Sequence, residues 1–235
     1  MDLEMQREFY DREWSDPRRQ FANANQLTRA VAVFEEILRT GVQRPRICEL
    51  GAGTGWLTSM LGSLGETTGV ELSEVAVAGA RRRYPHVSFE CADAVGWSYA
   101  ANSFDLVVSH EVLEHIVDQA AYLDTARRIL KPGGWLVLTT PNAKNVRATP
   151  PAIRSAQPVE NVVTRRELRR LLRPRFQHVR VRSVILGGGS KGVYRLVNST
   201  RLHRLLDGVR LGATFRNLAL GAGLGLHLVA IAQKC

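Results

Sequence analysis

Long apolar runs and paired cysteines are both missing from this 235-residue sequence. No stretch of about 18 or more uninterrupted apolar residues occurs, which argues against a membrane-spanning helix. The N-terminal segment MDLEMQREFYDREW is too polar for a secretion signal, so we expect a cytoplasmic protein. The three cysteines are odd in number and lack C-x-x-C spacing, which indicates neither a disulfide framework nor a structural zinc site.

Acidic residues are scarce in the C-terminal third. Residues 151–235 contain 16 Lys and Arg against 3 Asp and Glu, a balance of +13 within a total of +10, which leaves −3 for the first 150 residues. Charged runs are most often solvated, but this asymmetry favours an anionic substrate or partner, such as a phosphorylated molecule, a membrane surface or nucleic acid. The content of 45% hydrophobic and 23% charged residues fits one globular α/β domain with an added subdomain.

The stretch from Ile47 to Glu71 has the layout of a nucleotide-type pocket. A short apolar strand passes Glu49 and turns through three alternating glycines into a helical run, and a second apolar strand ends at Glu71. Glycines at such a turn allow a positive φ and bring main-chain N–H groups close to a ligand, while the second carboxylate can accept hydrogen bonds from ribose hydroxyls. A dinucleotide fingerprint would need its third glycine at Trp56, but Gly55 comes one residue earlier.

Further blocks follow in order along the chain. Asp93 comes directly after a short predicted strand. A buried-type strand over 103–109 continues into HEVLEH, residues 110–115, which we expect at the carboxyl end of the sheet, where ligands bind. After the next helix, LKPGG at 130–134 ends that helix and turns the chain back into the sheet.

Together these blocks, over roughly residues 45–142, resemble the class I S-adenosylmethionine (SAM)-dependent methyltransferases, in particular the small-molecule enzymes of ubiquinone and menaquinone biosynthesis. The matching features are E-x-G-x-G-x-G, the acidic end of the second strand, Asp93, the F-D to L-E-H block and L-K-P-G-G. The resemblance implies an α/β, Rossmann-like fold. Its seven-stranded, mostly parallel sheet has the order 3-2-1-4-5-7-6, with the last strand antiparallel and helices on both faces.

The resemblance also implies SAM as the cofactor. In that family the first carboxylate helps hold the methionine amino group, and the glycines make room for the ribose and methionine. The aspartate after the third strand accepts the adenine amine, and the first residue of the HEVLEH block contributes through its backbone. The cofactor-binding residues carried over in this way are Glu49, Gly51, Ala52, Gly53, Gly55, Glu71, Leu72, Asp93, Ala94 and His110.

Methyl transfer from a sulfonium is an in-line displacement, so the protein must hold an acceptor O or N about 3 Å from the methyl carbon and exclude water. His115 and Glu111 are the candidates for a general base, although His115 could instead brace the pocket. We expect methylation of an O or N of a small molecule, such as a quinone precursor, a sugar, a lipid-linked intermediate or a secondary metabolite.

Glu111, Glu114 and His115 also resemble the divalent-metal site of small-RNA 2′-O-methyltransferases. The downstream His of those enzymes is missing from residues 160–164, and we predict no metal site. The competing functions are an RNA 2′-O-methyltransferase-like enzyme that uses a metal at these residues, and a SAM- or anion-binding module without turnover. Nucleic acid is the less favoured partner, peripheral membrane contact through the basic C-terminal third stays open, and the sequence does not determine the oligomeric state.

We divide the chain into three regions. Residues 1–44 form N-terminal helices that could lie as a lid over the cofactor, and residues 45–142 form the SAM-binding core. Residues 143–235 form the C-terminal half of the sheet, with a basic helical insertion that shapes the acceptor pocket.

Three local expectations concern the less patterned regions. The apolar side of the second N-terminal helix is predicted from Leu27, Val31, Phe34, Ile37 and Leu38. Residues 143–159 are rich in proline and are predicted to form a loop. One amphipathic basic helix is predicted over 194–206, packed on the sheet through Leu196, Val197, Leu202, Leu205 and Leu206.

Overall fold

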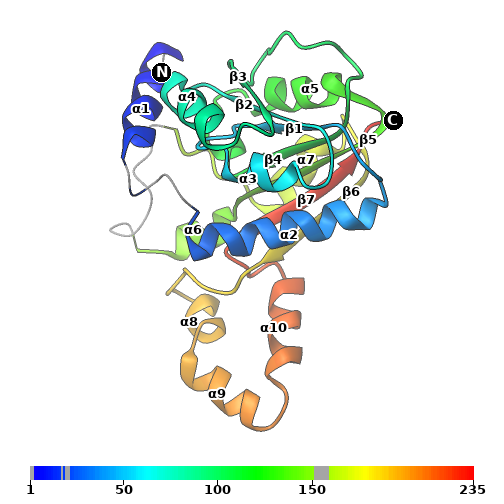
Figure 1. Cartoon of the computed structure of the whole chain (residues 1–235). Helices are drawn as coiled ribbons and strands as arrows, with labels where there is room; N and C mark the ends of the chain where they lie inside the picture. The colour runs from blue at the N-terminus through cyan, green and yellow to red at the C-terminus, as the bar shows by residue number, and fades with distance from the viewer. Residues whose placement is uncertain (1–2, 17, 19–21, 151–158) are drawn as a thin grey trace.

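The computed structural model describes residues 3–16, 18, 22–150 and 159–235. Its described part is built on one seven-stranded sheet in the order β3-β2-β1-β4-β5-β7-β6 (Figure 1). Pairing is parallel from β3 through β5, whereas β7 runs antiparallel to β5 and β6. The predicted fold class and strand order are confirmed. The strands are β1 Ile47–Leu50, β2 Thr67–Glu71, β3 Ser88–Cys91, β4 Phe104–His110, β5 Leu130–Pro141, β6 Gln177–Val184 and β7 His227–Gln233.

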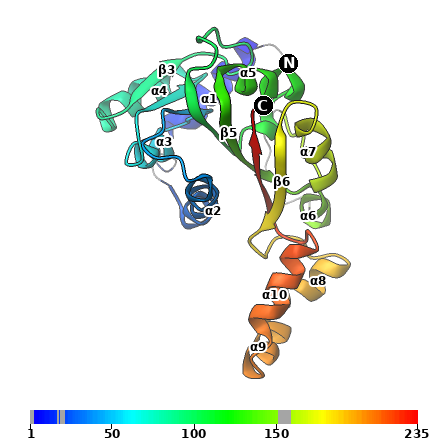
Figure 2. The same ribbon diagram turned by 90° about the vertical axis from the view of Figure 1, so that its right-hand side faces the viewer.

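Helices flank this sheet on both faces. Those of the N-terminal and central parts are α1 Leu3–Ser15, α2 Ala24–Thr40, α3 Trp56–Leu61, α4 Glu74–Arg83, the 3₁₀ helix η2 Leu113–His115 and α5 Gln119–Ile129. Those of the C-terminal part are α6 Ala143–Ala148, α7 Arg165–Leu172, α8 Val193–Val197, α9 Thr200–Gly208 and α10 Gly212–Gly221. Figure 2 shows α2 and α3 on one side of the sheet and α7 on the other.

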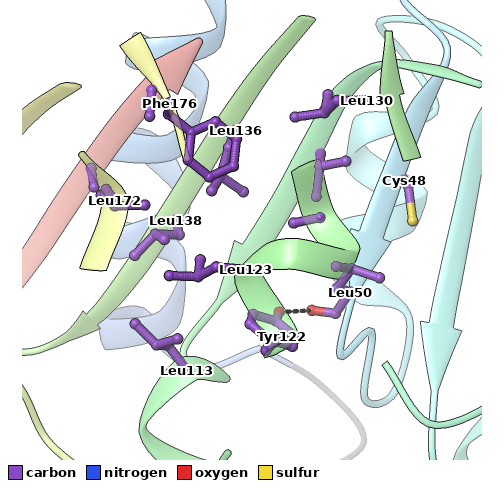
Figure 3. Packing of buried hydrophobic residues seen from close by; sticks show 14 of the residues in the cluster. Cys48, Leu50, Leu113, Tyr122, Leu123, Leu130, Leu136, Leu138, Leu172 and Phe176 are labelled. Atoms are coloured by element: carbon purple, nitrogen blue, oxygen red, sulfur yellow. Dashed lines mark hydrogen bonds between the residues drawn. The ribbon is translucent and has the colours of Figure 1, made fainter. Parts of the chain in front are cut away.

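Alternate residues of the central strands supply the two cores, because successive side chains of a strand point to opposite faces. Cys48 and Leu50 of β1 pack with α5 and α7, whereas Ile47 packs with α2 and α3. Figure 3 shows the first core, where Tyr122 of α5 reaches β1. Its hydroxyl lies 3.5 Å from the Leu50 carbonyl oxygen and 2.8 Å from Ser109 Oγ, so the buried phenol is satisfied.

Side-chain caps fix the start of several helices. The Asn23 side chain accepts from the Gln26 N–H at the start of α2, and the Ser73 side chain accepts from the Ala76 N–H at the start of α4. Thr164 begins α7 with a reciprocal capping box. These caps satisfy N–H groups that the helix itself leaves without partners, and they depend on neighbouring residues only.

The predicted apolar side of α2 is wrong in part. Ile37 is buried and Phe34 is half-buried, but Leu27, Val31 and Leu38 are exposed. The side that packs on the sheet is formed by Ala30, Val33 and Ile37. The acidic Glu36 is buried on this helix as well, where it accepts hydrogen bonds from Arg39 and from Arg182 of β6. Ion pairing to β6 therefore helps choose the buried side, and hydrophobic spacing alone does not reveal it.

Two predictions for the C-terminal region need correction. The expected loop over 143–159 begins with α6, which the Asn142 side chain caps, while residues 151–158 lie outside the described part. The expected single helix over 194–206 is broken at Asn198 and Ser199 into α8 and α9, because Ser199 caps a new helix. A third helix, α10, follows, and the group projects away from the sheet instead of packing on it (Figures 1 and 2).

None of the helices that the structure describes combines the length and the apolar character needed to cross a lipid bilayer.

Candidate active site

A cavity of about 840 Å³ lies at the carboxyl ends of β1, β2 and β4, and residues of α1 and α2 also line it. This is where ligands bind in open α/β sheets. It brings together nearly all of the predicted cofactor-binding residues: Glu49, Gly51, Ala52, Gly53, Glu71, Leu72, Asp93, Ala94 and His110. Both candidate catalytic residues, Glu111 and His115, line the same cavity.

The glycine turn after β1 is shaped by its contacts. Gly51 has φ +79°, and a Cβ added there would lie 2.4 Å from a methyl carbon of Val112. Gly55, the one predicted cofactor residue that does not line the cavity, has φ +80° and would push a Cβ against Phe89 and Ala80. Gly55 therefore serves the packing of α3 and α4 against β3, whereas Gly51 lets the glycine turn approach Val112, which also lines the cavity.

Glu71 at the end of β2 holds the glycine turn. Its buried carboxylate accepts the Gly53 N–H at 2.8 Å and the Ser73 N–H at 3.0 Å. Burial raises the pKa of Glu71, which these N–H groups partly offset. The Ser73 hydroxyl donates to Asp11 of α1, so the N-terminal helix is tied to the end of β2.

Glu49 is fully buried at the end of β1. Its Oε2 accepts a 2.5 Å hydrogen bond from the Thr58 hydroxyl of α3. Burial raises the pKa of Glu49 from 4.5 to about 8, and the nearby charge of Glu71 adds to the rise. Two buried carboxyl groups at one end of the cavity thus favour a ligand that brings positive charge or hydroxyl donors.

Asp93 follows β3 and lines the cavity beside Leu72 and Ala94. Its Oδ1 accepts the Val95 N–H at 2.9 Å, which leaves the other carboxylate oxygen available to a ligand.

A polar cluster of four residues forms the other end of the cavity. Glu111, just beyond β4, has φ +58°, an unusual conformation for a residue other than glycine. Its Oε2 lies 2.9 Å from Nδ1 of His227 and 3.7 Å from Nε of Arg29. Burial alone would raise the pKa of Glu111, but the neighbouring His227 and Arg29 lower it to about 2. Glu111 is therefore ionised and paired.

Sequence reasoning missed two members of this polar cluster. Arg29 comes from α2 and His227 begins β7, and neither lies in a motif that indicates a site. His110 completes the cluster, and burial lowers its pKa to about 4. Buried side-chain atoms without a hydrogen-bond partner among the described residues include Arg29 Nε, His110 Nε2 and Glu111 Oε1. Such a concentration of unsatisfied polar atoms in one cavity indicates a site for a polar ligand.

His115 lies beside this cluster. Its Nδ1 is 3.0 Å from the Val159 carbonyl oxygen, which can only accept, so Nδ1 carries the proton. Burial lowers the pKa of His115, which keeps the ring neutral and leaves the Nε2 lone pair available. Nε2 is 3.6 Å from Oε1 of Glu114, whose own pKa is raised well above its usual value by burial and by Glu111.

The three candidate metal ligands do not converge. Glu111 pairs with Arg29 and His227, whereas Glu114 accepts a hydrogen bond from the Thr140 hydroxyl at 2.9 Å. Within residues 3–16, 18, 22–150 and 159–235, no group of three or more His, Cys, Asp or Glu side chains is arranged to hold a metal ion. The geometry gives the metal hypothesis no support.

Residues of α1 cover the cofactor end of the cavity. Tyr10 and Trp14 line it, and the Trp14 ring lies 3.3 Å from where a Cβ on Gly53 would stand. The Tyr10 ring meets the ring of His115 edge-on at a centroid distance of 6.5 Å. Residues of α1 therefore form part of the cavity wall, and the lid role of residues 1–44 stays a prediction.

The strand order and the glycine turn between two acidic strand ends define the class I SAM-dependent methyltransferase fold. The chain belongs to the methyltransferase-domain family, whose profile matches residues 6–183.

Relatives and solved structures agree with this assignment. A ubiquinone biosynthesis O-methyltransferase of Ruegeria pomeroyi is 31% identical over 165 residues, which cover 63% of this chain and 65% of that protein. One from Thiobacillus denitrificans is 29% identical over 135 residues, which cover 55% of this chain and 58% of that protein. The N-methyltransferase NodS from Bradyrhizobium japonicum, solved with S-adenosyl-L-homocysteine, has a TM-score of 0.68 at 18% identity, covering 97% of this chain and 98% of that one. The chain therefore spans less than two thirds of the length of these two curated relatives.

SAM is the cofactor of this family, and the residues present fit it. The molecule carries an ammonium group, a sulfonium centre and ribose hydroxyls. Glu49 and Glu71 offer two buried carboxyl groups, and burial raises the pKa of both, so a positively charged group or a hydroxyl donor from a ligand would stabilise their ionised forms. Gly51 beside them lines the cavity, and the absence of a side chain there lets the turn approach Val112.

Proposed function

We propose that the chain transfers a methyl group from SAM to an oxygen of a small polar molecule. The observation that carries this proposal is the continuity of one cavity, which joins the carboxyl groups of Glu49 and Glu71 to the polar cluster around Glu111. When bound, SAM supplies an electrophilic methyl group. The protein's own part is to place an acceptor beside it, exclude water and accept a proton.

We assign the cofactor roles to the residues at the acidic end of the cavity. Glu49 would hold the amino group of the methionine part, and Glu71 would accept hydrogen bonds from the ribose hydroxyls. Asp93 would accept the adenine amine. The place of all three carboxylates on the wall of one cavity supports this division.

His115 is the better candidate for the proton acceptor. Its neutral ring presents the Nε2 lone pair, because Nδ1 donates to Val159. Glu111 is a weak base, since its lowered pKa favours the ionised form. We assign Glu111 to acceptor binding, where its ion pair with His227 and Arg29 holds the cluster in place.

The acceptor is inferred from the same cluster. It combines nitrogen atoms that can donate with a carboxylate oxygen that can only accept. A molecule that carries neighbouring hydroxyl groups matches both kinds of partner. The ubiquinone biosynthesis O-methyltransferases among the relatives support a hydroxylated quinone precursor as the finer choice.

Activity with labelled SAM tests the proposal. Phenols, catechols and amines would be compared as acceptors, and we expect product with hydroxylated aromatic acceptors. SAM binding in calorimetry without turnover on any of these compounds would favour a binding module. Turnover on amines alone would contradict the oxygen assignment.

The variant His115→Gln separates catalysis from binding. We expect kcat to fall about 100-fold or more, with SAM affinity unchanged, because a general base contributes a factor of this order. His86→Gln is the control, since that ring contacts Ser59 outside the cavity. In the wild type saturated with SAM and acceptor, kcat should be flat above pH 6.5 and fall only at lower pH, because burial lowers the pKa of His115 and the neutral ring is the base. A variant as active as the wild type would remove His115 from this role.

A further inference from the structure

The helices α8, α9 and α10, residues 193–221, form a helical arm that leaves the sheet between β6 and β7. Figures 1 and 2 show the arm projecting beyond the rest of the fold, with the connection between α9 and α10 far from the sheet. The arm holds itself together, since the rings of His203 and Phe215 meet edge-on at 5.7 Å. No residue of the arm belongs to the two main cores, although Tyr194 and Val197 of α8 are buried.

The arm exposes large apolar side chains. α9 buries none of its residues, and α10 buries only Gly212 and Ala219. Six of the 14 exposed large hydrophobic residues among the described ones belong to the arm: Val193, Leu196, Leu205, Val209, Leu211 and Leu218, with exposed fractions from 50% to 69%. A concentration of this kind in so short a segment marks an interaction surface.

The same arm is strongly basic. Together with Lys191 at its base, it carries the arginines at 195, 201, 204, 210 and 216, against a single acidic residue, Asp207. Arg216 pairs with Asp207 at 2.9 Å, and no other of these basic side chains forms an ion pair with a carboxylate within the described part. Most of the positive charge is therefore available to a partner.

We propose that the helical arm docks on the surface of an anionic phospholipid bilayer. The exposed leucines of the arm can enter the boundary of the acyl chains, and the neighbouring arginines can contact the phosphate headgroups. A second copy of the arm fits less well, because it would bring arginines against arginines.

The arm is joined to the fold beside the cavity, so docking of the arm would also position the cavity relative to the bilayer. Gly188 and Leu226, which stand at the two stems of the arm, both line the cavity. Docking would therefore hold the acceptor end of the cavity close to the lipid. This last step rests on the proposed function, whereas the docking itself does not.

Vesicle sedimentation with the full chain tests the docking. Phosphatidylcholine vesicles would be compared with vesicles of equal parts phosphatidylcholine and phosphatidylglycerol, and we expect binding to the anionic ones. The pair Leu205→Gln and Leu218→Gln should weaken that binding on the order of ten-fold. The pair Arg201→Gln and Arg204→Gln should weaken it roughly 25-fold, at roughly five-fold for each charge.

Matched controls lie elsewhere on the surface. Leu38→Gln removes an equally exposed leucine from α2, and Arg82→Gln with Arg166→Gln removes two exposed arginines outside the arm. These variants should bind vesicles like the wild type. SAM affinity by calorimetry would show that each variant is folded, independently of any methylation.

Three results would overturn the proposal. The first is no binding to anionic vesicles, and the second is binding that the leucine pair leaves unchanged, which would mean adsorption by charge alone. The third is a dimer in analytical ultracentrifugation that the leucine pair dissociates while vesicle binding persists, which would assign the arm to a second copy.

Discussion

Replacing Glu49 by glutamine should show how a buried carboxyl group at the cofactor end of the cavity affects the stability of the protein and its binding of a cationic ligand. The pKa of Glu49 is raised from 4.5 to about 8 in the folded protein, chiefly by burial. Between these two pH values the unfolded chain has released the proton and the folded chain keeps it. Without cofactor, the free energy of unfolding must therefore fall as pH rises through this range.

The size of the effect follows from the two pKa values. The change from 4.5 to about 8 corresponds to roughly 5 kcal/mol, at about 1.4 kcal/mol for each pKa unit. This stability is fully present below pH 4.5 and lost as pH rises to about 8. Glu49→Gln keeps the shape and the Thr58 contact but cannot ionise, so its stability should not carry this slope.

Cofactor binding should reverse the trend. A cationic ligand favours the ionised form of Glu49, so binding near pH 7 should release a proton and affinity should rise toward pH 8. Glu49→Gln should bind SAM more weakly and without proton release.

Urea unfolding of the cofactor-free protein from about pH 5 to pH 9, together with calorimetry in buffers of different ionisation enthalpy, measures both effects. The exposed Glu66→Gln is the control, since it should leave the pH slope of the wild type unchanged. If wild type and Glu49→Gln keep parallel stability curves over this range, the buried carboxyl group is ionised in the free protein and the reasoning fails.

Two further predictions concern the glycine turn and the link between α2 and β6. Gly51→Ala should weaken SAM binding in calorimetry about ten-fold or more and lower the melting temperature, because its Cβ would collide with Val112 at a positive φ. Gly79→Ala, in open space within α4, should be neutral or stabilising, and equal losses in both variants would refute the steric argument. Glu36→Gln should destabilise the protein by about 2 kcal/mol in urea unfolding, because it weakens the charge-assisted hydrogen bonds between the buried Glu36 carboxylate and its partly exposed arginine partners. Glu35→Gln, at the exposed end of the same network, should cost less than about 1 kcal/mol, and a reversed order would mean that the buried pair adds nothing.

The cofactor half of the cavity could be predicted because it depends on short stretches of chain. A glycine turn, an acidic strand end and a helix cap are set by residues a few positions apart, so Glu49, Glu71 and Asp93 could be named without coordinates. Gly55 shows the limit. The spacing of the glycines assigned Gly55 to cofactor binding. In the structure, the lack of a side chain at Gly55 makes room for Phe89 and Ala80, which only the folded chain brings close to it.

The acceptor half could not be predicted in the same way. Arg29 and His227 reach Glu111 from opposite ends of the chain, and their approach depends on how α2 lies across the sheet and where β7 inserts. The same contact between α2 and β6 buries Glu36 and turns Leu27 and Leu38 outward, against their hydrophobic spacing.

Patterns within single elements of the sequence predicted an α/β fold and a glycine turn between two acidic strand ends, because these depend on local backbone conformation. The strand order came from the resemblance to the methyltransferase family. Tertiary structure alone decided the polar cluster at the acceptor end and the projection of the helical arm. Both depend on which side chains meet in the folded chain. The residues next to an arginine or a leucine in the sequence do not indicate whether it forms an ion pair or stays exposed. The methyl donor could therefore be named from the sequence, whereas the proposals for the acceptor and the bilayer rest on the folded chain.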